Sequence, residues 1–217
     1  MRSSEPYRGV LFDLDGTLTN TLQDIADAMN RSLRLHSLPE WPLDAYRYLV
    51  GNGAVNLSKK AVRDRQDLQP EVLRDYQAWY ERHAMVKTCP YPGIPELLRA
   101  LRERGMKLCV FSNKPHADTV NVVRHYFPEI PFDEIRGQQP GIPVKPDPQG
   151  ALLAAEKMGL KPEEILYLGD TSVDMLCARN AGMRPIGVLW GFREEEELVK
   201  AGAEGLLKEP MELMNLL

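Results

Sequence analysis

The sequence has few of the features that mark secreted, membrane-spanning or thiolate-metal proteins. Its three cysteines, Cys89, Cys109 and Cys177, are far apart and contain no CxxC pair, so neither a disulfide framework nor a cysteine metal site is indicated. No apolar run is long enough to span a membrane, and the polar start MRSSEPYRG lacks the apolar core of a signal peptide. We therefore expect a cytoplasmic protein with no membrane partner.

An excess of basic residues is also missing. The 27 lysines and arginines are scattered along the chain and are outnumbered by 31 acidic residues, which gives a net charge of −4. Such a balance offers no electrostatic footprint for nucleic acid, so we expect no nucleic-acid partner. The sequence also lacks repeats and low-complexity tracts, and its length suits one or two globular domains. It does not distinguish a monomer from a homodimer.

Short apolar runs alternate with helical patterns from residue 91 onward. The runs MKLCVFS, FDEIR, ILYLG and PIGVLW predict strands, and GVLFDL at residues 9–14 predicts one more at the start of the chain. Between them lie four segments whose apolar residues recur at helical spacing. Strands that alternate with helices predict βαβ units. We expect a three-layer α/β/α, Rossmann-like parallel sheet with helices on both faces.

Residues 18–86 interrupt this alternation. Apolar residues at positions 18, 22, 25, 29 and 33 form one helical stripe, further helical patterns follow at 43–50, 54–65 and 71–84, and no strand is evident. The pattern predicts an inserted all-helical cap domain at 18–86, with the α/β core formed by residues 1–17 and 87–217. Ligands of open α/β sheets bind beyond the carboxyl ends of the strands, so this insertion would cover the expected site.

Two aspartates stand at the end of the first predicted strand, in the sequence Asp13-Leu14-Asp15-Gly16. Asp-Gly is a common hairpin signal, but the following residues are helical, and Thr21 with Asp24 fits a helix-capping pattern. In a strand, Asp13 and Asp15 would point to the same side, where two carboxylates repel each other unless a cation is present. A turn and a functional pair both remain open from these residues alone.

Polar residues follow other predicted strands as well. Ser112 and Asn113 come after one of them and Asp170 after another; their hydroxyl, amide and carboxylate groups suit phosphate and Mg²⁺, although Ser-Asn is also common in loops. Asp174 would lie in the first turn of a helix, where acidic residues are ordinarily favourable. A single lysine such as Lys145 is ordinarily a surface residue. If it lies in an acidic cleft, it would be the counter-charge for a phosphoryl group.

Taken in order, these motifs resemble those of the haloacid dehalogenase-like phosphohydrolases. The four motifs are D13-L-D15-G-T17, S112-N113, K145-P146 and G169-D170-T-S-V-D174, and the resemblance covers nearly the whole chain. The helical segment after the first motif resembles the helical cap of that family. The resemblance implies a Mg²⁺-dependent phosphatase that acts on a small phosphorylated metabolite through an aspartyl-phosphate.

The resemblance also implies a role for each charged residue. Asp13 would be the nucleophile, and Asp15 would protonate the leaving alcohol and then deprotonate the hydrolytic water. Mg²⁺ would be held by Asp13, the backbone carbonyl of Asp15, and Asp170. Lys145 would stabilise the developing negative charge, and Asp174 would hold Lys145 or a metal-bound water. The second aspartate favours a phosphatase over the dehalogenase branch.

Phosphate oxygens would be bound by a second group of residues. The resemblance assigns this task to Gly16 and Thr17 of the first motif, to Ser112 and Asn113 of the second, and to Lys145. Gly16 would let backbone amides approach the phosphate closely.

Within the family the chain is most similar to the phosphoglycolate phosphatase group. The cap sequence V50-G-N-G-A54 and the stretches YPGIPELL, FSNKP and WGFREEEELVKAGAE carry this likeness. Asn52 and Gly53 could present amide groups to a small carboxylate substrate, or could form an ordinary helix–helix turn. The chain departs from the family at Asn20-Thr21, where Asp-Ser is usual, which bears on the substrate more than on catalysis.

Other functions are compatible with parts of this pattern. A phosphosugar mutase or a pyrophosphatase would use the same fold and the same aspartates. A non-hydrolytic receiver-like domain also clusters aspartates, Mg²⁺ and a lysine, but it needs no helical insertion and does not carry the DxDGT order. A catalytically silent sensor is disfavoured because each chemical position is filled.

Overall fold

A parallel sheet forms the centre of the molecule in the computed structural model, which describes residues 7–217. Residues 1–6, which include the polar start of the chain, lie outside the described residues. The strand order is β5-β4-β1-β6-β7-β8, and all neighbouring strands are parallel. The strands are β1 (Gly9–Phe12), β4 (Lys107–Pro115), β5 (Glu134–Gln138), β6 (Ile165–Gly169), β7 (Arg184–Val188) and β8 (Gly205–Leu207).

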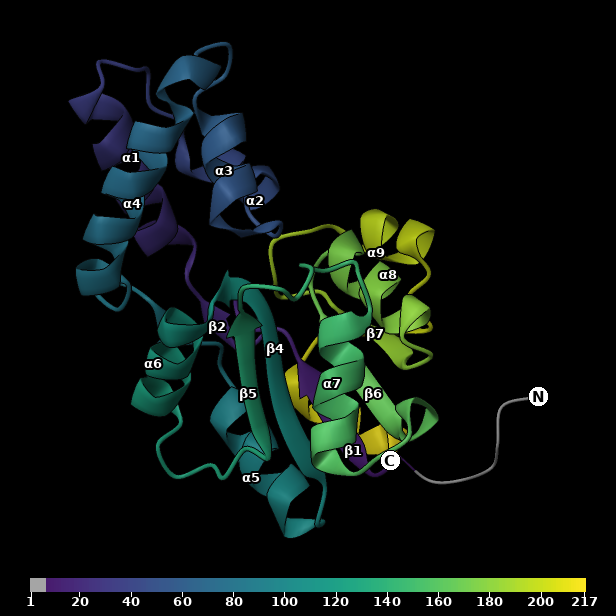
Figure 1. Cartoon of the computed structure of the whole chain (residues 1–217). Coiled ribbons are helices and arrows are strands. Elements are labelled where there is room, and N and C mark those ends of the chain that lie inside the picture. Colours follow the sequence, from purple (N-terminus) through teal and green to yellow (C-terminus); the bar gives the residue numbers. More distant parts are fainter. Residues whose placement is uncertain (1–6) are drawn as a thin grey trace.

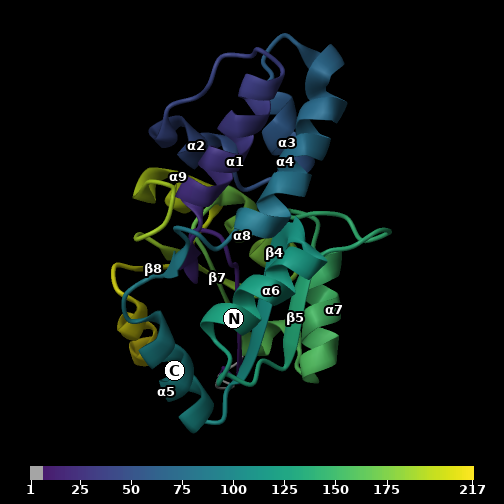
Figure 2. The same ribbon diagram turned by 90° about the vertical axis from the view of Figure 1, so that its left-hand side faces the viewer.

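Alternate residues of each central strand pack on opposite faces of the sheet. Val10 and Phe12 of β1 belong to the apolar cluster on one face, whereas Leu11 belongs to the cluster on the other. The first face is covered by α5 (Ile94–Glu103), α6 (His116–Tyr126) and the 3₁₀ helix η3 (Pro210–Leu216). The second is covered by α7 (Gln149–Met158) and α8 (Ser172–Asn180). The predicted three-layer α/β/α fold is confirmed, and Figure 2 shows α6 and α7 on either side of β5.

Four helices form a separate layer above the sheet. They are α1 (Leu22–Leu35), α2 (Leu43–Leu49), α3 (Gly53–Ala61) and α4 (Gln69–His83), with the short 3₁₀ helix η1 (Gln66–Leu68) before α4. Figure 1 shows them over the ends at which β4 and β5 finish. Their apolar faces meet in a cluster of their own, which includes Met29, Leu33, Tyr46 and Tyr76. The apolar stripe of α1 therefore serves this cluster and not the sheet.

Two short strands connect this helical layer to the rest of the chain. β2 (Thr19–Asn20) leads into α1, β3 (Cys89–Pro90) leads back to the sheet, and the two pair in antiparallel fashion. The expectation that 18–86 contains no strand is wrong at this point, because two residues are too few to show alternation in the sequence. β8 was also not anticipated, and β1 ends two residues earlier than the apolar run suggests.

Asp24 does not cap α1 as its sequence context predicts. Thr21 occupies the N-cap position, but its side chain makes no capping hydrogen bond. The buried Asp24 carboxylate instead accepts hydrogen bonds from the backbone N–H groups of Val86, Lys87 and Thr88, and from the Thr88 hydroxyl. A short-range capping pattern has been replaced by a contact more than 60 residues away in the chain. Asp24 thereby fastens the start of α1 to the segment that returns to β3.

Two further helical elements accompany the sheet. The helix α9 (Glu195–Ala201) packs against α8 through Met175 and Leu198, and the 3₁₀ helix η2 (Pro162–Glu164) precedes β6. The acidic run at 194–197 begins α9, where negative charge is favourable beside the N-terminus of a helix. Each helix within residues 7–217 is too short or too polar to cross a lipid bilayer.

Replacing Asp24 should weaken the connection between α1 and the returning segment. Asp24→Asn presents an amide N–H₂ group to backbone N–H donors, and hydrogen bonds to a charged group are each worth about 1.5–3 kcal/mol. We expect the free energy of unfolding, measured with urea, to fall by about 2–3 kcal/mol. Asp27→Asn on the same helix affects only exposed contacts, an ion pair with Lys87 and a hydrogen bond from Gln23, and should change the free energy of unfolding by less than about 1 kcal/mol. Equal losses in the two variants would contradict the assignment.

Candidate active site

The polar residues singled out in the sequence gather at one edge of the sheet. Asp13 directly follows β1, Ser112 and Asn113 lie in the last part of β4, and Asp170 directly follows β6. Because β4, β1 and β6 are adjacent and parallel, their carboxyl ends meet, which brings these side chains together. Lys145 comes from the loop between β5 and α7, and its side chain is almost fully buried at the same edge.

Lys145 lies between two buried carboxylates. Its Nζ is 2.9 Å from Asp13 Oδ1 and 2.7 Å from Asp174 Oδ1. Burial raises the pKa of Asp13 to about 7, with a further contribution from the charge of Asp174, and the nearby Lys145 only partly offsets this rise. Burial lowers the pKa of Lys145, but the two carboxylates outweigh this effect and the pKa is raised. Lys145 is therefore a fixed positive charge beside Asp13.

Asp170 is the third carboxylate of this buried group. It is fully buried and accepts hydrogen bonds from the Thr17 hydroxyl at 3.2 Å and from the backbone N–H of Phe192 at 2.9 Å. Burial, followed by the charges of Asp174 and Asp13, raises its pKa well above the usual value. One oxygen from each of Asp13, Asp170 and Asp174 lies within 4.8 Å of the others. Three crowded carboxylates are hard oxygen ligands, and a divalent cation would relieve their repulsion.

Both carboxylate oxygens of Asp174 accept hydrogen bonds. Oδ1 accepts the Lys145 ammonium, while Oδ2 accepts the backbone N–H and the hydroxyl of Thr171 and so completes a capping box at the start of α8. By contrast, Asp13 Oδ2 accepts no hydrogen bond from the described residues, although Oδ1 accepts Lys145 and the N–H of Leu14. Asp13 Oδ2 is therefore the carboxylate oxygen of this group that is available to react.

Gly16 has a different task from the one that the motif suggests. Its backbone N–H donates to Thr19 O at 2.8 Å, and the N–H of Thr17 donates to Leu14 O at 3.2 Å, so both amides are used inside a tight turn. The φ angle of Gly16 is +89°, and a Cβ atom there would overlap the carboxylate of Asp170. Gly16 and Thr17 thus shape the space around Asp170, and the expectation that their amides face phosphate is not supported.

Asp15 is held by a lysine that the sequence analysis did not single out. Lys114 Nζ is 3.0 Å from both carboxylate oxygens of Asp15 and 2.8 Å from the hydroxyl oxygen of Tyr80, which comes from α4. Lys114 is only 6% exposed. A lysine directly after Ser-Asn at a strand end reads as a loop residue, and only its place at the end of an apolar run could have indicated burial. The side chains of Asp13 and Asp15 therefore have separate lysine partners.

Further hydrogen bonds join the helical layer to the core near these residues. The Asn113 side chain donates to Gly51 O at 3.1 Å, Arg193 donates to Val50 O at 3.0 Å, and Arg47 donates to Phe192 O at 2.9 Å. Asn113 Oδ1 also accepts the backbone N–H of Lys145 at 2.8 Å. The Asn113 side chain thus connects the loop at Gly51 in the helical layer with the backbone at Lys145.

A pocket lies between the acidic edge and the helical layer. Its empty space is about 620 Å³, open solvent included, and Asp13, Asp15, Ser112, Asn113 and Lys145 line its floor. The residues that line it from the helical layer are Ile25, Val50, Gly51, Gly53, Ala54, Leu57, Tyr76, Gln77 and Tyr80. Gly53 of the predicted substrate loop therefore reaches the pocket. Asn52 does not line it and instead precedes α3, where its carbonyl accepts the Asn56 side chain.

Comparison with known proteins agrees with this geometry. Residues 10–188 match the model of the haloacid dehalogenase-like hydrolases. The chain belongs to the haloacid dehalogenase-like hydrolase family. It is 31% identical to a phosphoglycolate phosphatase of Nitrosospira multiformis over 98% of this chain and 96% of that protein. A phosphoglycolate phosphatase of Aquifex aeolicus is 34% identical, over 85% of this chain and 86% of its own length.

A solved structure is also similar to this chain over nearly its whole length. The structure of a predicted phosphoglycolate phosphatase from Haemophilus somnus matches with a TM-score of 0.90 at 26% identity, covering 98% of this chain and 99% of that one. The resemblance found in the sequence is confirmed, both for the family and for the phosphoglycolate phosphatase group. The chain is thus an enzyme of the phosphoric monoester hydrolase class, with an acidic group that could hold a metal ion.

Gly16→Ala tests whether Gly16 is needed to make room for Asp170. The added methyl group meets a positive φ and the Asp170 carboxylate, whereas Gly141→Ala meets a similar φ of +80° with no atom within 4 Å. We expect Gly141→Ala to lower the free energy of unfolding by about 1–2 kcal/mol, and Gly16→Ala to lower it by roughly 1–3 kcal/mol more. Urea unfolding of both variants measures the difference. Equal losses would show that Asp170 is not crowded by Gly16.

Proposed function

We propose that this protein is a Mg²⁺-dependent phosphatase that hydrolyses a small phosphomonoester, with phosphoglycolate as the preferred substrate, through an aspartyl-phosphate. The observation that carries the proposal is the single open oxygen of Asp13, at the floor of the pocket, beside a buried lysine. The phosphoglycolate phosphatases among its relatives support the choice of substrate. In this proposal residues 18–86 are the cap domain, and residues 1–17 with 87–217 are the catalytic core.

Asp13 is the nucleophile in this proposal. Its Oδ2 atom attacks phosphorus, while Oδ1 is fixed by Lys145 and by the Leu14 N–H, which keeps the carboxylate in one orientation. The Lys145 ammonium favours the ionised carboxylate and stabilises charge on the phosphoryl oxygens as the bond to the alcohol breaks. Ser112 and Asn113 complete the phosphate site at the end of β4, where both are almost fully buried.

Asp15 is the general acid and base. As a carboxylic acid it gives its proton to the oxygen of the departing alcohol, and as a carboxylate it takes a proton from the water that hydrolyses the aspartyl-phosphate. The position fits this role because Asp15 lines the pocket two residues after Asp13 and remains partly exposed. The Asp15 carboxylate is thus accessible from the pocket, whereas Asp170 and Asp174 are fully buried.

The residues present fit a Mg²⁺ ion. The proposal assigns Asp13, the backbone carbonyl of Asp15, and Asp170 as its ligands, with Asp174 as the residue that orients Lys145. One oxygen from each of Asp13, Asp170 and Asp174 lies within 4.8 Å of the others, and burial together with their mutual repulsion raises the pKa values of Asp13 and Asp170. When bound, Mg²⁺ supplies charge neutralisation between the nucleophile and the phosphate.

The cap loop is proposed to select the substrate. Gly53 and Ala54 at the start of α3 face the pocket, and the amide N–H groups of a helix start are suited to a carboxylate. Most other cap residues in the pocket are apolar or aromatic, which favours a small alcohol part over a sugar. The Asn20-Thr21 pair lies in β2 and at the start of α1, where the Thr21 hydroxyl is buried without a hydrogen-bond partner.

Asp13→Asn should abolish phosphate release and leave the fold intact. The asparagine amide cannot attack phosphorus. Burial and the charge of Asp174 already disfavour the ionised form of Asp13, so a neutral side chain at this position should not destabilise the fold. We expect turnover to fall by at least about 10⁴-fold, with no decrease in the free energy of unfolding in urea. Retained phosphate release would refute the assignment of Asp13 as nucleophile.

Removal of divalent cations should stop the reaction reversibly. A chelator such as EDTA should abolish phosphate release, and added Mg²⁺ should restore it. Asp170→Asn should raise the Mg²⁺ concentration for half-maximal activity by about tenfold or more, because one ligand loses its charge. Glu196→Gln, far along the chain in the exposed α9 turn, is the control and should leave this concentration unchanged. Full activity in EDTA would exclude the metal requirement.

The substrate is tested by measuring phosphate release from a panel of phosphorylated metabolites. Phosphoglycolate should be hydrolysed with the highest kcat/KM. Faster release from pyrophosphate, or conversion of a hexose phosphate into its isomer without free phosphate, would replace this function by one of the two alternatives of the same fold.

A further inference from the structure

Lys114 is a buried cation that the proposed chemistry does not use. Its ammonium group has three N–H donors, and three acceptors surround it: Oδ1 and Oδ2 of Asp15 at 3.0 Å each, and the Tyr80 hydroxyl at 2.8 Å. The ammonium also lies 4.7 Å from the centre of the Tyr80 ring. Lys114 therefore has no donor left for a phosphate oxygen while these contacts hold.

The partners of Lys114 come from three separate parts of the chain. Lys114 lies at the end of β4, Asp15 follows β1, and Tyr80 is a core residue of the helical layer, where its ring stacks on Tyr76. Burial lowers the pKa of Lys114, but the Asp15 carboxylate outweighs this effect and the pKa is raised. The lysine thus stays charged although only 6% of its surface is exposed.

We propose that Lys114 is a positioning residue that fixes the orientation of the Asp15 carboxyl group, and that Tyr80 makes this orientation depend on the cap. The inference rests on the proposed role of Asp15 as general acid and base. A carboxylate bound through both oxygens cannot rotate freely about its χ angles, so its direction relative to the phosphate site is set before the substrate binds. The third contact, to Tyr80, exists only while α4 stands over β4.

A leaving-group comparison separates this role from a structural one. Ethyl phosphate releases a strongly basic alkoxide that needs a proton from the acid, whereas p-nitrophenyl phosphate releases a stable phenolate that needs little assistance. The ratio kcat/KM includes the steps up to alcohol release and excludes the later hydrolysis, which both substrates share. A misaligned Asp15 should therefore harm the alkyl substrate selectively.

Lys114→Met keeps the length and the apolar stem of the side chain but removes the ammonium group. We expect kcat/KM for ethyl phosphate to fall about 100-fold and that for p-nitrophenyl phosphate to fall less than about tenfold. Tyr80→Phe removes one of the three acceptors and leaves the ring, so it should shift the two values in the same direction by a smaller factor, about 3- to 10-fold for ethyl phosphate.

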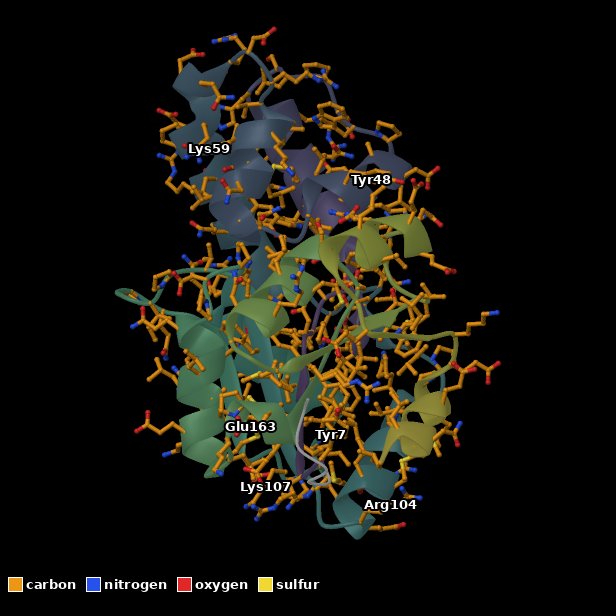
Figure 3. All side chains as sticks on the ribbon, turned by 90° about the vertical axis from the view of Figure 1, so that its right-hand side faces the viewer. Tyr7, Tyr48, Lys59, Arg104, Lys107 and Glu163 are labelled. Atoms are coloured by element: carbon orange, nitrogen blue, oxygen red, sulfur yellow. The ribbon has the colours of Figure 1, made fainter. Side chains whose placement is uncertain are left out.

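Two matched controls lie away from the site. Lys107→Met changes a lysine at the other end of β4, which pairs with Asp133 and which Figure 3 shows at the end of the molecule away from the helical layer. Tyr46→Phe removes a cap hydroxyl that donates to Asn30. Neither control should change the ratio of the two substrates, whatever it does to the free energy of unfolding.

Three results would overturn the inference. Equal losses on both substrates would indicate a structural or phosphate-binding role, and unchanged rates would indicate none. A loss confined to phosphoglycolate, measured in parallel, would show that Lys114 binds the carboxylate of the substrate. If Lys114→Met does not fold, Tyr80→Phe decides by the same comparison. A wild-type protein that releases no phosphate from any of the three esters would refute the proposed function instead.

Discussion

Lys145 is buried beside Asp13 and Asp174, and Asp170 lies close to these two carboxylates and completes a group of three. Burial raises the pKa values of Asp13 and Asp170, and the charges of the neighbouring carboxylates add to this rise because one ammonium does not balance three negative charges. Other features follow from this imbalance. Thr17 and the Phe192 amide donate to the two oxygens of Asp170, Thr171 donates to Asp174 Oδ2, and glycine at position 16 leaves room for Asp170.

The parallel sheet brings the carboxylates together and also sets how close they come. Each carboxylate comes from the carboxyl end of a strand or from the helix that follows, so the strand spacing sets the distances between them. Asp15, only two residues from Asp13, leaves the group because the chain turns sharply at Gly16 and Thr19. Its carboxylate pairs with Lys114 instead. Two neighbouring aspartates thus occupy different electrostatic surroundings, which suits the proposed roles of nucleophile for Asp13 and proton carrier for Asp15.

The fold and the meeting of the site residues could be predicted because both depend on regular features. Alternation of strands and helices implies a parallel sheet, and Asp13 and Asp170 follow adjacent strands. Lys114 was missed because its place after an apolar run is a weak signal of burial, and its partners come from distant parts of the chain, the turn after β1 and α4. Asp24 was misassigned because a capping pattern spans four residues, whereas the hydrogen bonds that it makes join residues about 60 apart.

The pairing of β2 with β3, together with the Asp24 carboxylate, has a mechanical consequence. The two chain segments that enter and leave the helical layer are held as a single ribbon and cannot slide past each other without breaking hydrogen bonds. A rotation of the helical layer about that ribbon would keep these bonds, and it would carry Tyr80 and the loop at Gly51 away from β4 together. Such a rotation would open the pocket to the substrate and would break the contact between Lys114 and Tyr80 at the same time.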